Sequence, residues 1–90
     1  GAAVRVSDSD ILSSIPEIAR SAGVFCEPAA AAGWAAAKKA AAMGAIQSGE
    51  RVVVVLTGHG LKDIASARRV AGAPILIDAS IDSALAATES

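Results

Sequence analysis

A hydroxyl, two glycines and a charged pair follow the most apolar run of the chain, and residues of these types can hold a small ligand. The run is Val52 to Leu56, and Thr-Gly-His-Gly-Leu-Lys-Asp follows it from Thr57 to Asp63. The Thr57 hydroxyl can donate or accept one hydrogen bond, which suits a heterocyclic nitrogen or a phosphate oxygen. Backbone N–H groups around Gly58 can turn toward the same ligand. We expect a binding site directly after Leu56, with Thr57 as its polar contact.

The loop residues also have simpler explanations, which stay open from the sequence. Thr57 could just end a strand while the glycines make a turn, because short Gly-rich loops are weak signals. His59 fits a solvent-facing loop residue better than a group that touches substrate. Lys62 and Asp63 could form a local ion pair of small worth, or Lys62 could hold the loop over a ligand. With one histidine and one cysteine, neither a metal site nor a Cys-His nucleophile is expected.

Glu27 and Trp34 each allow a functional and a structural interpretation. Glu27 precedes Pro28 at the expected start of a helix, where the helix dipole favours a carboxylate. From the residues alone, an ordinary capping acid is the better interpretation. Trp34 lies among alanines and is most simply a packing anchor at a boundary with further protein. No serine-histidine-acid set, paired carboxylates or phosphate-loop motif appears, so no catalytic residue is assigned.

The elements that must position the site are predicted to alternate between helix and strand. Apolar residues on both faces of Val52–Leu56 are typical of a parallel strand covered on each side, and ligands bind beyond the carboxyl ends of such strands. A shorter strand is expected over 73–77, with Pro74 suited to an edge position. Because one inner strand cannot form a sheet, the chain is expected to be a piece of a larger α/β fold.

Four helices are predicted from apolar spacing and capping residues. The first follows a Ser7 cap and ends at Gly23, and Pro16 should kink or split it, with Ser14 and Glu17 able to cap a restart. An alanine-rich helix apolar nearly all round is normally buried. The alanine-rich helix, the second of the four, is expected over 28–43. The third and fourth helices are expected over 63–70 and 80–87.

Composition narrows the function classes. The chain has 90 residues, of which 53% are apolar, and a net charge of −1, which gives no electrostatic case for nucleic acid or an anionic membrane. The apolar content is mostly small and includes 23 alanines, so the core that the chain can build alone is thin. Its one cysteine fits a reducing cytoplasm, and no signal peptide or spanning segment is expected.

Three motifs in order resemble the threonine synthase family. They are VSDSDIL at Val6–Leu12, GVFCEPAAAA at Gly23–Ala32 and LTGHGLKD at Leu56–Asp63, the last resembling a C-terminal signature. The resemblance implies an α/β chain that forms part of a three-layer α/β/α parallel-sheet domain, the tryptophan-synthase-β-like fold that uses pyridoxal 5'-phosphate. Residues 1–90 would be the C-terminal segment of this larger domain. His59 stands where the family often has Asn, and Ile64 replaces a common Pro.

The resemblance also implies a reaction and a set of cofactor contacts. The full-length parent would be a cytoplasmic homodimer that converts O-phospho-L-homoserine and water into L-threonine and phosphate. Thr57 would hydrogen-bond the pyridine nitrogen of the cofactor, with Gly58 and Glu27 near it. The Schiff-base lysine of the family lies in an upstream Ser-x-Lys-Asp segment, and Lys62 has the wrong context to replace it. The segment would therefore need the remainder of the enzyme chain and would be inactive alone.

Two alternatives remain beside this expectation. The chain could be a standalone, non-catalytic α/β module that binds an anion or a partner through the Thr57 loop. It could also belong to a related pyridoxal-phosphate-dependent lyase such as threonine dehydratase, since the discriminating residues of these enzymes lie mostly outside this segment.

Overall fold

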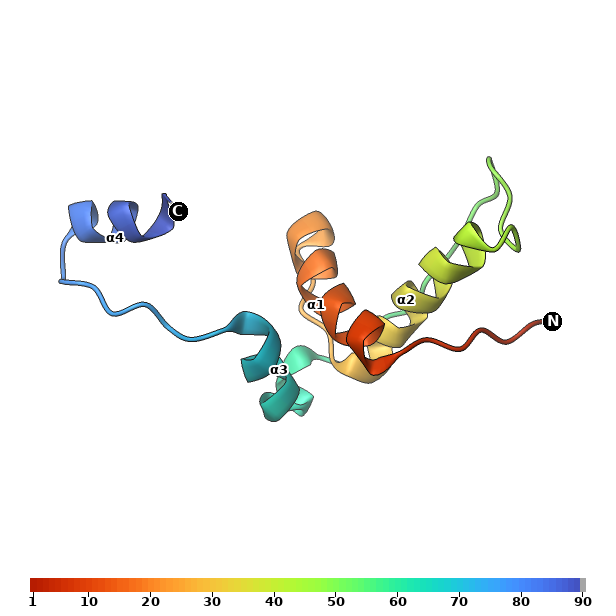
Figure 1. Cartoon of the computed structure of the whole chain (residues 1–90), viewed down its shortest axis with the longest axis horizontal. Coiled ribbons are helices and arrows are strands. Elements are labelled where there is room, and N and C mark those ends of the chain that lie inside the picture. The colour runs from red at the N-terminus through yellow and green to blue at the C-terminus, as the bar shows by residue number, and fades with distance from the viewer. Residues whose placement is uncertain (90) are drawn as a thin grey trace.

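The computed structural model describes residues 1–89, and within them it contains helices joined by unpaired segments (Figure 1). The Cα radius of gyration is 16.4 Å and the longest extent is 54 Å, whereas a compact chain of this length has a radius near ~12 Å. No helix of the described part combines the length and apolar character needed to cross a membrane. The elements are α1 Asp8–Ala22, α2 Pro28–Ala42, the 3₁₀ turn η1 Gly60–Lys62, α3 Ile64–Ala71 and α4 Ile81–Thr88.

Helix α1 begins and ends at the residues that the sequence predicts. The backbone N–H of Asp10 donates to Ser7 Oγ at 3.0 Å, which satisfies one of the free donors of the first turn. Gly23 lies in the left-handed region at φ 70° and donates its N–H to the carbonyl of Ala19. This conformation carries no steric cost for glycine and closes the helix.

Pro16 does not split α1, which is continuous from Asp8 to Ala22. The predicted restart is wrong, because Ser14 lies inside the helix, fully buried, and its hydroxyl donates to the carbonyl of Asp10 at 2.8 Å. Proline removes one helical hydrogen bond. Ile15 and Ile18 on either side of it are buried at 2% and 5% exposure, and this packing holds the helix together across the missing bond.

Helix α2 packs against α1 and supplies the other half of a small core. Pro28 occupies its first turn and Met43 its C-cap, within one residue of the predicted bounds. The buried residues of the helix are Ala30, Ala31, Ala35 and Ala40, whereas Lys38 and Lys39 are exposed and the other residues between them are exposed or half-buried. The expected burial nearly all round is therefore absent within residues 1–89. The core cluster consists of Ile15, Ile18, Cys26, Ala30 and Ala31.

The segment Val52–Leu56 runs along α2 but forms no strand, and the described part of the chain contains no sheet. Val54 and Leu56 are partly buried, and Val54 approaches Gly33 of α2. Val53, which precedes Val54, is 85% exposed, and Val55, which lies between Val54 and Leu56, is 70% exposed. Only one of the two faces is covered within residues 1–89. The segment forms no strand because the backbone groups of a strand need a neighbouring strand as hydrogen-bond partner.

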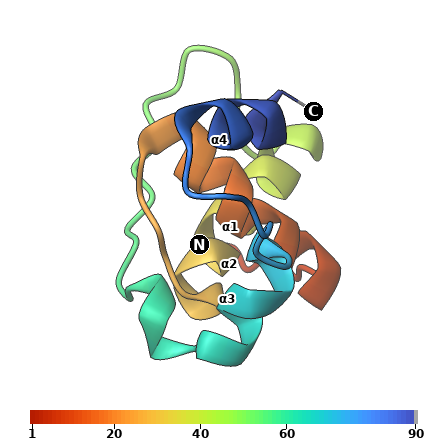
Figure 2. The ribbon, with the colours of Figure 1, turned by 90° about the vertical axis from the view of Figure 1, so that its left-hand side faces the viewer.

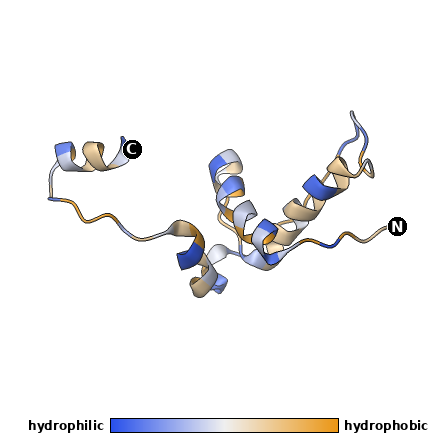
Figure 3. Ribbon diagram, in the orientation of Figure 1, coloured by the Kyte–Doolittle hydropathy of each residue, from blue (hydrophilic) through white to orange (hydrophobic). Residues whose placement is uncertain are grey.

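The chain beyond Gly72 forms an arm that leaves the helical pair (Figure 1), and Figure 2 looks along this arm, with α4 in front of the other helices. The predicted second strand at 73–77 is also unpaired, and Leu76 is fully exposed. Helix α4 follows its predicted cap, where the N–H of Ser83 donates to Ser80 Oγ at 3.1 Å. Figure 3 shows the apolar character of the segment between α3 and α4, and this surface has no partner within the described residues.

Candidate functional site

Two segments meet beside the start of α2 and fix the loop after Leu56. The N–H of Glu27 donates to the carbonyl of Gly58 at 3.0 Å, and the N–H of Gly60 donates to the carbonyl of Phe25 at 3.1 Å. These bonds flank a single antiparallel pair, Cys26 with His59, which we call the 26–59 bridge. The bridge holds the glycine loop against the turn that precedes α2.

The carboxylate of Glu27 belongs to this loop contact, and the prediction of a capping acid holds only for its position at the start of the helix. Glu27 occupies the N-cap position of α2, but its side chain accepts no capping hydrogen bond. Its carboxylate instead lies against Gly58, with Oε1 at 3.9 Å from Lys62 Nζ. The Glu27 side chain is 20% exposed and that of Lys62 is 66% exposed, so the ion pair is open to solvent on the lysine side.

Asp63 binds the following helix, and the suggested local pair with Lys62 does not form. Its Oδ1 accepts from the N–H of Ser66 at 3.0 Å, and its Oδ2 accepts from the Ser66 hydroxyl at 2.8 Å. These bonds, first of all the one from the backbone, lower the pKa of the Asp63 carboxyl. Asp63 therefore caps α3 and fixes the end of the loop, while Lys62 pairs with Glu27.

His59 is exposed, as predicted for a solvent-facing loop residue, and it also shapes the loop. Its Nδ1 accepts a hydrogen bond from the N–H of Leu61 at 3.1 Å and caps η1. Its ring packs edge to face against Phe25, with the ring centroids 5.6 Å apart. No local pattern indicates this contact, because Phe25 and His59 are far apart in the sequence and the bridge brings them together.

Thr57 lies two residues before His59 of the 26–59 bridge, and its side chain is exposed. Within residues 1–89 its hydroxyl makes no hydrogen bond, so both of its hydrogen-bonding functions are available to a ligand. The structure brings together the three predicted site residues, Thr57, Gly58 and Glu27, since Gly58 is in contact with Glu27 and adjoins Thr57. The arrangement holds Gly58, the residue next to Thr57, against Glu27.

Other ligating chemistry is absent from this part of the molecule. The described residues contain no group of three His, Cys, Asp or Glu side chains that could hold a metal ion. Cys26 is 1% exposed, and burial raises the pKa of its thiol. A neutral buried thiol is a poor nucleophile, so Cys26 is a core residue.

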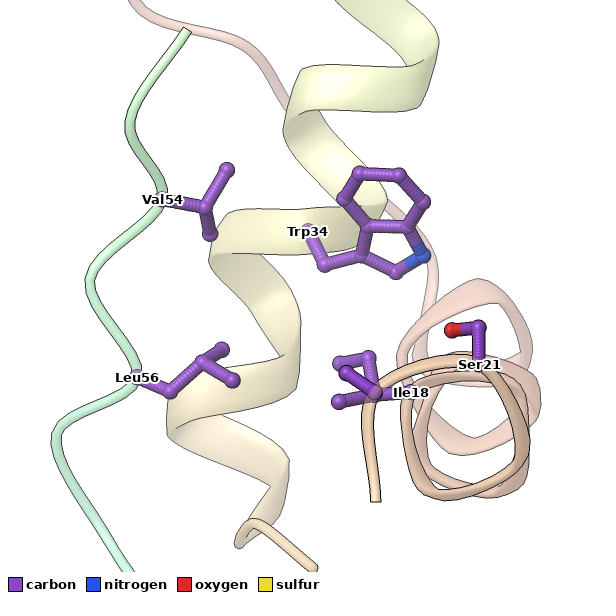
Figure 4. Close-up of a pocket in the computed structure, with 6 residues that line it drawn as sticks. Ile18, Ser21, Trp34, Val54 and Leu56 are labelled. Carbon is purple, nitrogen blue, oxygen red and sulfur yellow. The ribbon is translucent and has the colours of Figure 1, made fainter. Parts of the chain in front are cut away.

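An apolar pocket of about 210 Å³ lies next to the loop, and the sequence analysis did not predict it (Figure 4). Trp34 packs against the core of this chain, and its buried Nε1 has no hydrogen-bond partner among the described residues. The predicted boundary with further protein stays a prediction. Lys38 Nζ lies 5.8 Å from the indole centroid and forms an ion pair with Glu17, which lowers the pKa of the Glu17 carboxyl. The pocket is lined by Ile18, Ser21, Ala22, Trp34, Val54 and Leu56.

Comparison with known proteins agrees with the resemblance carried by the three motifs. Residues 1–58 match the family model described as pyridoxal-phosphate dependent enzyme. The chain is 42% identical to a threonine synthase of Methanocaldococcus jannaschii over 78 residues. The matched region is 87% of this chain and 19% of that relative. The chain is also 42% identical over 82 residues to a threonine synthase of Methanosarcina acetivorans, covering 91% and 20%.

A bacterial relative gives the same result over a shorter region. The threonine synthase of Halalkalibacterium halodurans is 48% identical over 58 residues, which is 64% of this chain and 16% of the relative. The chain thus spans about a fifth of the length of the first two curated relatives and less of the third. Since the family model matches well over half of its residues, the chain belongs to the family of pyridoxal-phosphate dependent enzymes, and its similarity within that family is to threonine synthases.

Proposed function

We propose that this chain is part of a threonine synthase, which converts O-phospho-L-homoserine and water into L-threonine and phosphate with pyridoxal 5'-phosphate. Similarity to threonine synthases from archaea and bacteria supports the reaction. The whole enzyme carries out the reaction, because the chain spans only about a fifth of these relatives. In this proposal the enzyme is a cytoplasmic homodimer, and the segment is inactive without the remainder of its chain.

Thr57 supplies the contact to the pyridine nitrogen of the cofactor. The observation that carries this role is the exposed Thr57 hydroxyl, which is free of hydrogen bonds within residues 1–89 and held next to the 26–59 bridge. A single uncharged donor of this kind fits a ring nitrogen. Gly58 adjoins Thr57 and is in contact with Glu27, which supports a place for both residues at the border of the same ring.

The chemistry of the loop follows from the kind of donor that Thr57 provides. When bound, pyridoxal phosphate acts as the electron sink for the reacting amino acid. A hydroxyl is too weak an acid to protonate the ring nitrogen, so Thr57 leaves the ring largely neutral and moderates that sink. Lys62 does not supply the covalent link to the cofactor in this proposal, because it follows Gly60-Leu61 in the loop motif and not a Ser-x pair in a Ser-x-Lys-Asp segment. That lysine belongs to the upstream part of the enzyme.

The segment Val52–Leu56 is an inner strand of a three-layer α/β/α parallel sheet in the full-length enzyme. Its exposed valines, Val53 at 85% and Val55 at 70%, support this role because they leave an apolar face open for cover by further protein. Neighbouring strands would bind the backbone groups that are unpaired in residues 52–56. The carboxyl end of the strand then delivers Thr57 to the site.

Product analysis on the full-length enzyme tests the proposed function. We expect phosphate and L-threonine in equal amounts from O-phospho-L-homoserine, with no consumption of L-threonine. Loss of ammonia from L-threonine without turnover of the phosphate ester would assign the segment to a dehydratase instead. A full-length protein that does not bind pyridoxal phosphate and turns over neither substrate would favour a non-catalytic binding module.

A further inference from the structure

Gly58 is a glycine for reasons of space and not of backbone conformation. The glycines in the left-handed region are Gly23, Gly44, Gly49 and Gly72, and Gly58 is not among them. A methyl group on Gly58 would nevertheless overlap Oε1 and Cδ of Glu27 and lie 2.6 Å from its Cγ. The backbone at 58 accepts any residue, but the Glu27 side chain occupies the position of its Cβ.

Glu27 contacts the loop at three points. Its N–H donates to the carbonyl of Gly58 at 3.0 Å, its side chain lies against the Cα of the same residue, and its carboxylate is 3.9 Å from Lys62 Nζ. The first two contacts act on the residue that adjoins Thr57. The third is solvent-exposed at Lys62 and is therefore weak.

We propose that Glu27 is the positioning residue for Thr57: its side chain fills the space above Gly58 and so sets where the Thr57 hydroxyl lies in the cofactor site. The proposal rests on the proposed function of Thr57 and adds the residue that controls it. Glu27 acts through Gly58 and needs no contact with the cofactor. The lysine pair supports the carboxylate and contributes less than the packing.

A double-mutant cycle in the full-length enzyme tests the proposal with Gly58→Ala, Glu27→Ala and both together. The readouts are the dissociation constant of pyridoxal phosphate, the visible absorbance of the bound cofactor and the melting temperature of the cofactor-free protein. Gly58→Ala alone should displace the flexible end of the Glu27 side chain, weaken cofactor binding about fivefold and shift the absorbance. With alanine at 27 the space is open, so Gly58→Ala should then change affinity by less than about twofold.

Two matched variants separate this effect from general damage. Gly60→Ala overlaps the Phe25 ring in the same loop, and Glu27→Ala should not relieve its cost. Gly33→Ala meets only Val54 Cγ1 at 3.4 Å, an ordinary contact, and should leave cofactor affinity unchanged.

Lys62→Met should weaken cofactor binding by less than about fivefold, and Lys62→Arg should restore it.

The cycle overturns the proposal when Gly58→Ala costs the same with glutamate or alanine at position 27. If Gly58→Ala fails to fold, the double variant must recover folding, and its failure beside a stable Glu27→Ala protein also overturns the proposal. An unmodified enzyme without cofactor binding would remove the proposed function instead. The melting temperatures of the cofactor-free proteins would still report whether Glu27 and Gly58 are coupled.

Discussion

The helical pair α1–α2 and the segment Val52–Leu56 are both rich in apolar residues, yet only the pair forms regular structure within residues 1–89. The backbone N–H and C=O groups of a helix form hydrogen bonds within the helix, so α1 and α2 need only one apolar side each to form a small core. The backbone groups of a strand must form hydrogen bonds with another strand. The difference teaches that local sequence is sufficient for the helices, while the strand depends on protein that the described residues do not include.

The largest expected effect is the loss of the core between the two helices. Ile15→Ala should lower the free energy of unfolding by about 2–5 kcal/mol, because Ile15 is 2% exposed and its removal leaves a cavity. Ile75→Ala, at a residue that is 67% exposed, is the control and should cost less than about 0.5 kcal/mol. Urea unfolding of the 90-residue chain measures both. Equal costs would show that the α1–α2 core does not exist.

Val53→Ala sharpens the comparison, because it measures what covers the valine segment. In the 90-residue chain the change should cost less than about 0.5 kcal/mol, since Val53 is 85% exposed. In the full-length enzyme, where we propose an inner strand, the same change should cost about 1–3 kcal/mol. Urea unfolding of both proteins gives the two values. A small cost in both would argue against the proposed sheet.

Two serine caps compare the packed and unpacked ends of the chain. Ser7→Ala removes the cap of α1 and should lower global stability by about 1 kcal/mol. Ser80→Ala removes an equivalent cap of α4, which lies apart from the helical pair, and should unfold α4 without affecting the rest. Amide hydrogen exchange in α1 and α4 separates local from global opening. Faster exchange in α1 after Ser80→Ala would show that the arm packs against the pair.

Acid should release the end of the site loop before it affects the core. The Asp63 pKa is lowered below its ordinary value of 3.8 in the folded chain, so its ionised form stabilises the folded state. This contribution is complete above the ordinary value and is lost as the pH falls through the lowered one. Hydrogen exchange of the Ser66 amide between pH 5 and pH 2 measures it, with Asp63→Asn as the control. An unchanged pH dependence in Asp63→Asn would contradict the assignment.

The caps could be predicted from the sequence because their partners are a few residues away. Ser7, Gly23 and Ser80 were predicted as helix ends and lie within one residue of one. Asp63 was expected as the first residue of a helix and is instead its N-cap. The kink or split at Pro16 was expected from local chemistry, and burial of the neighbouring isoleucines explains why α1 continues. Local pattern is reliable here wherever no distant contact competes with it.

The site was predicted in part, and the missed part is non-local. The position of Thr57 after an apolar segment indicated the loop, and the Glu-Pro motif indicated Glu27. Sequence could not show that the Glu27 carboxylate packs on Gly58, because the 26–59 bridge brings distant segments together. The helix position of Glu27 favoured a cap for the same reason, since its competing partner was invisible in the local sequence.

The most direct test of the account is the spectrum and turnover of the full-length Thr57→Val enzyme, with Thr57→Ser as the matched control. Valine keeps the shape of the side chain and removes the hydroxyl, so the enzyme should still bind pyridoxal phosphate but show shifted visible absorbance and slower release of phosphate from O-phospho-L-homoserine. Serine retains the hydroxyl and should stay close to the unmodified enzyme. A valine variant with unchanged absorbance and rate would contradict the central claim, that the loop delivers Thr57 to the cofactor.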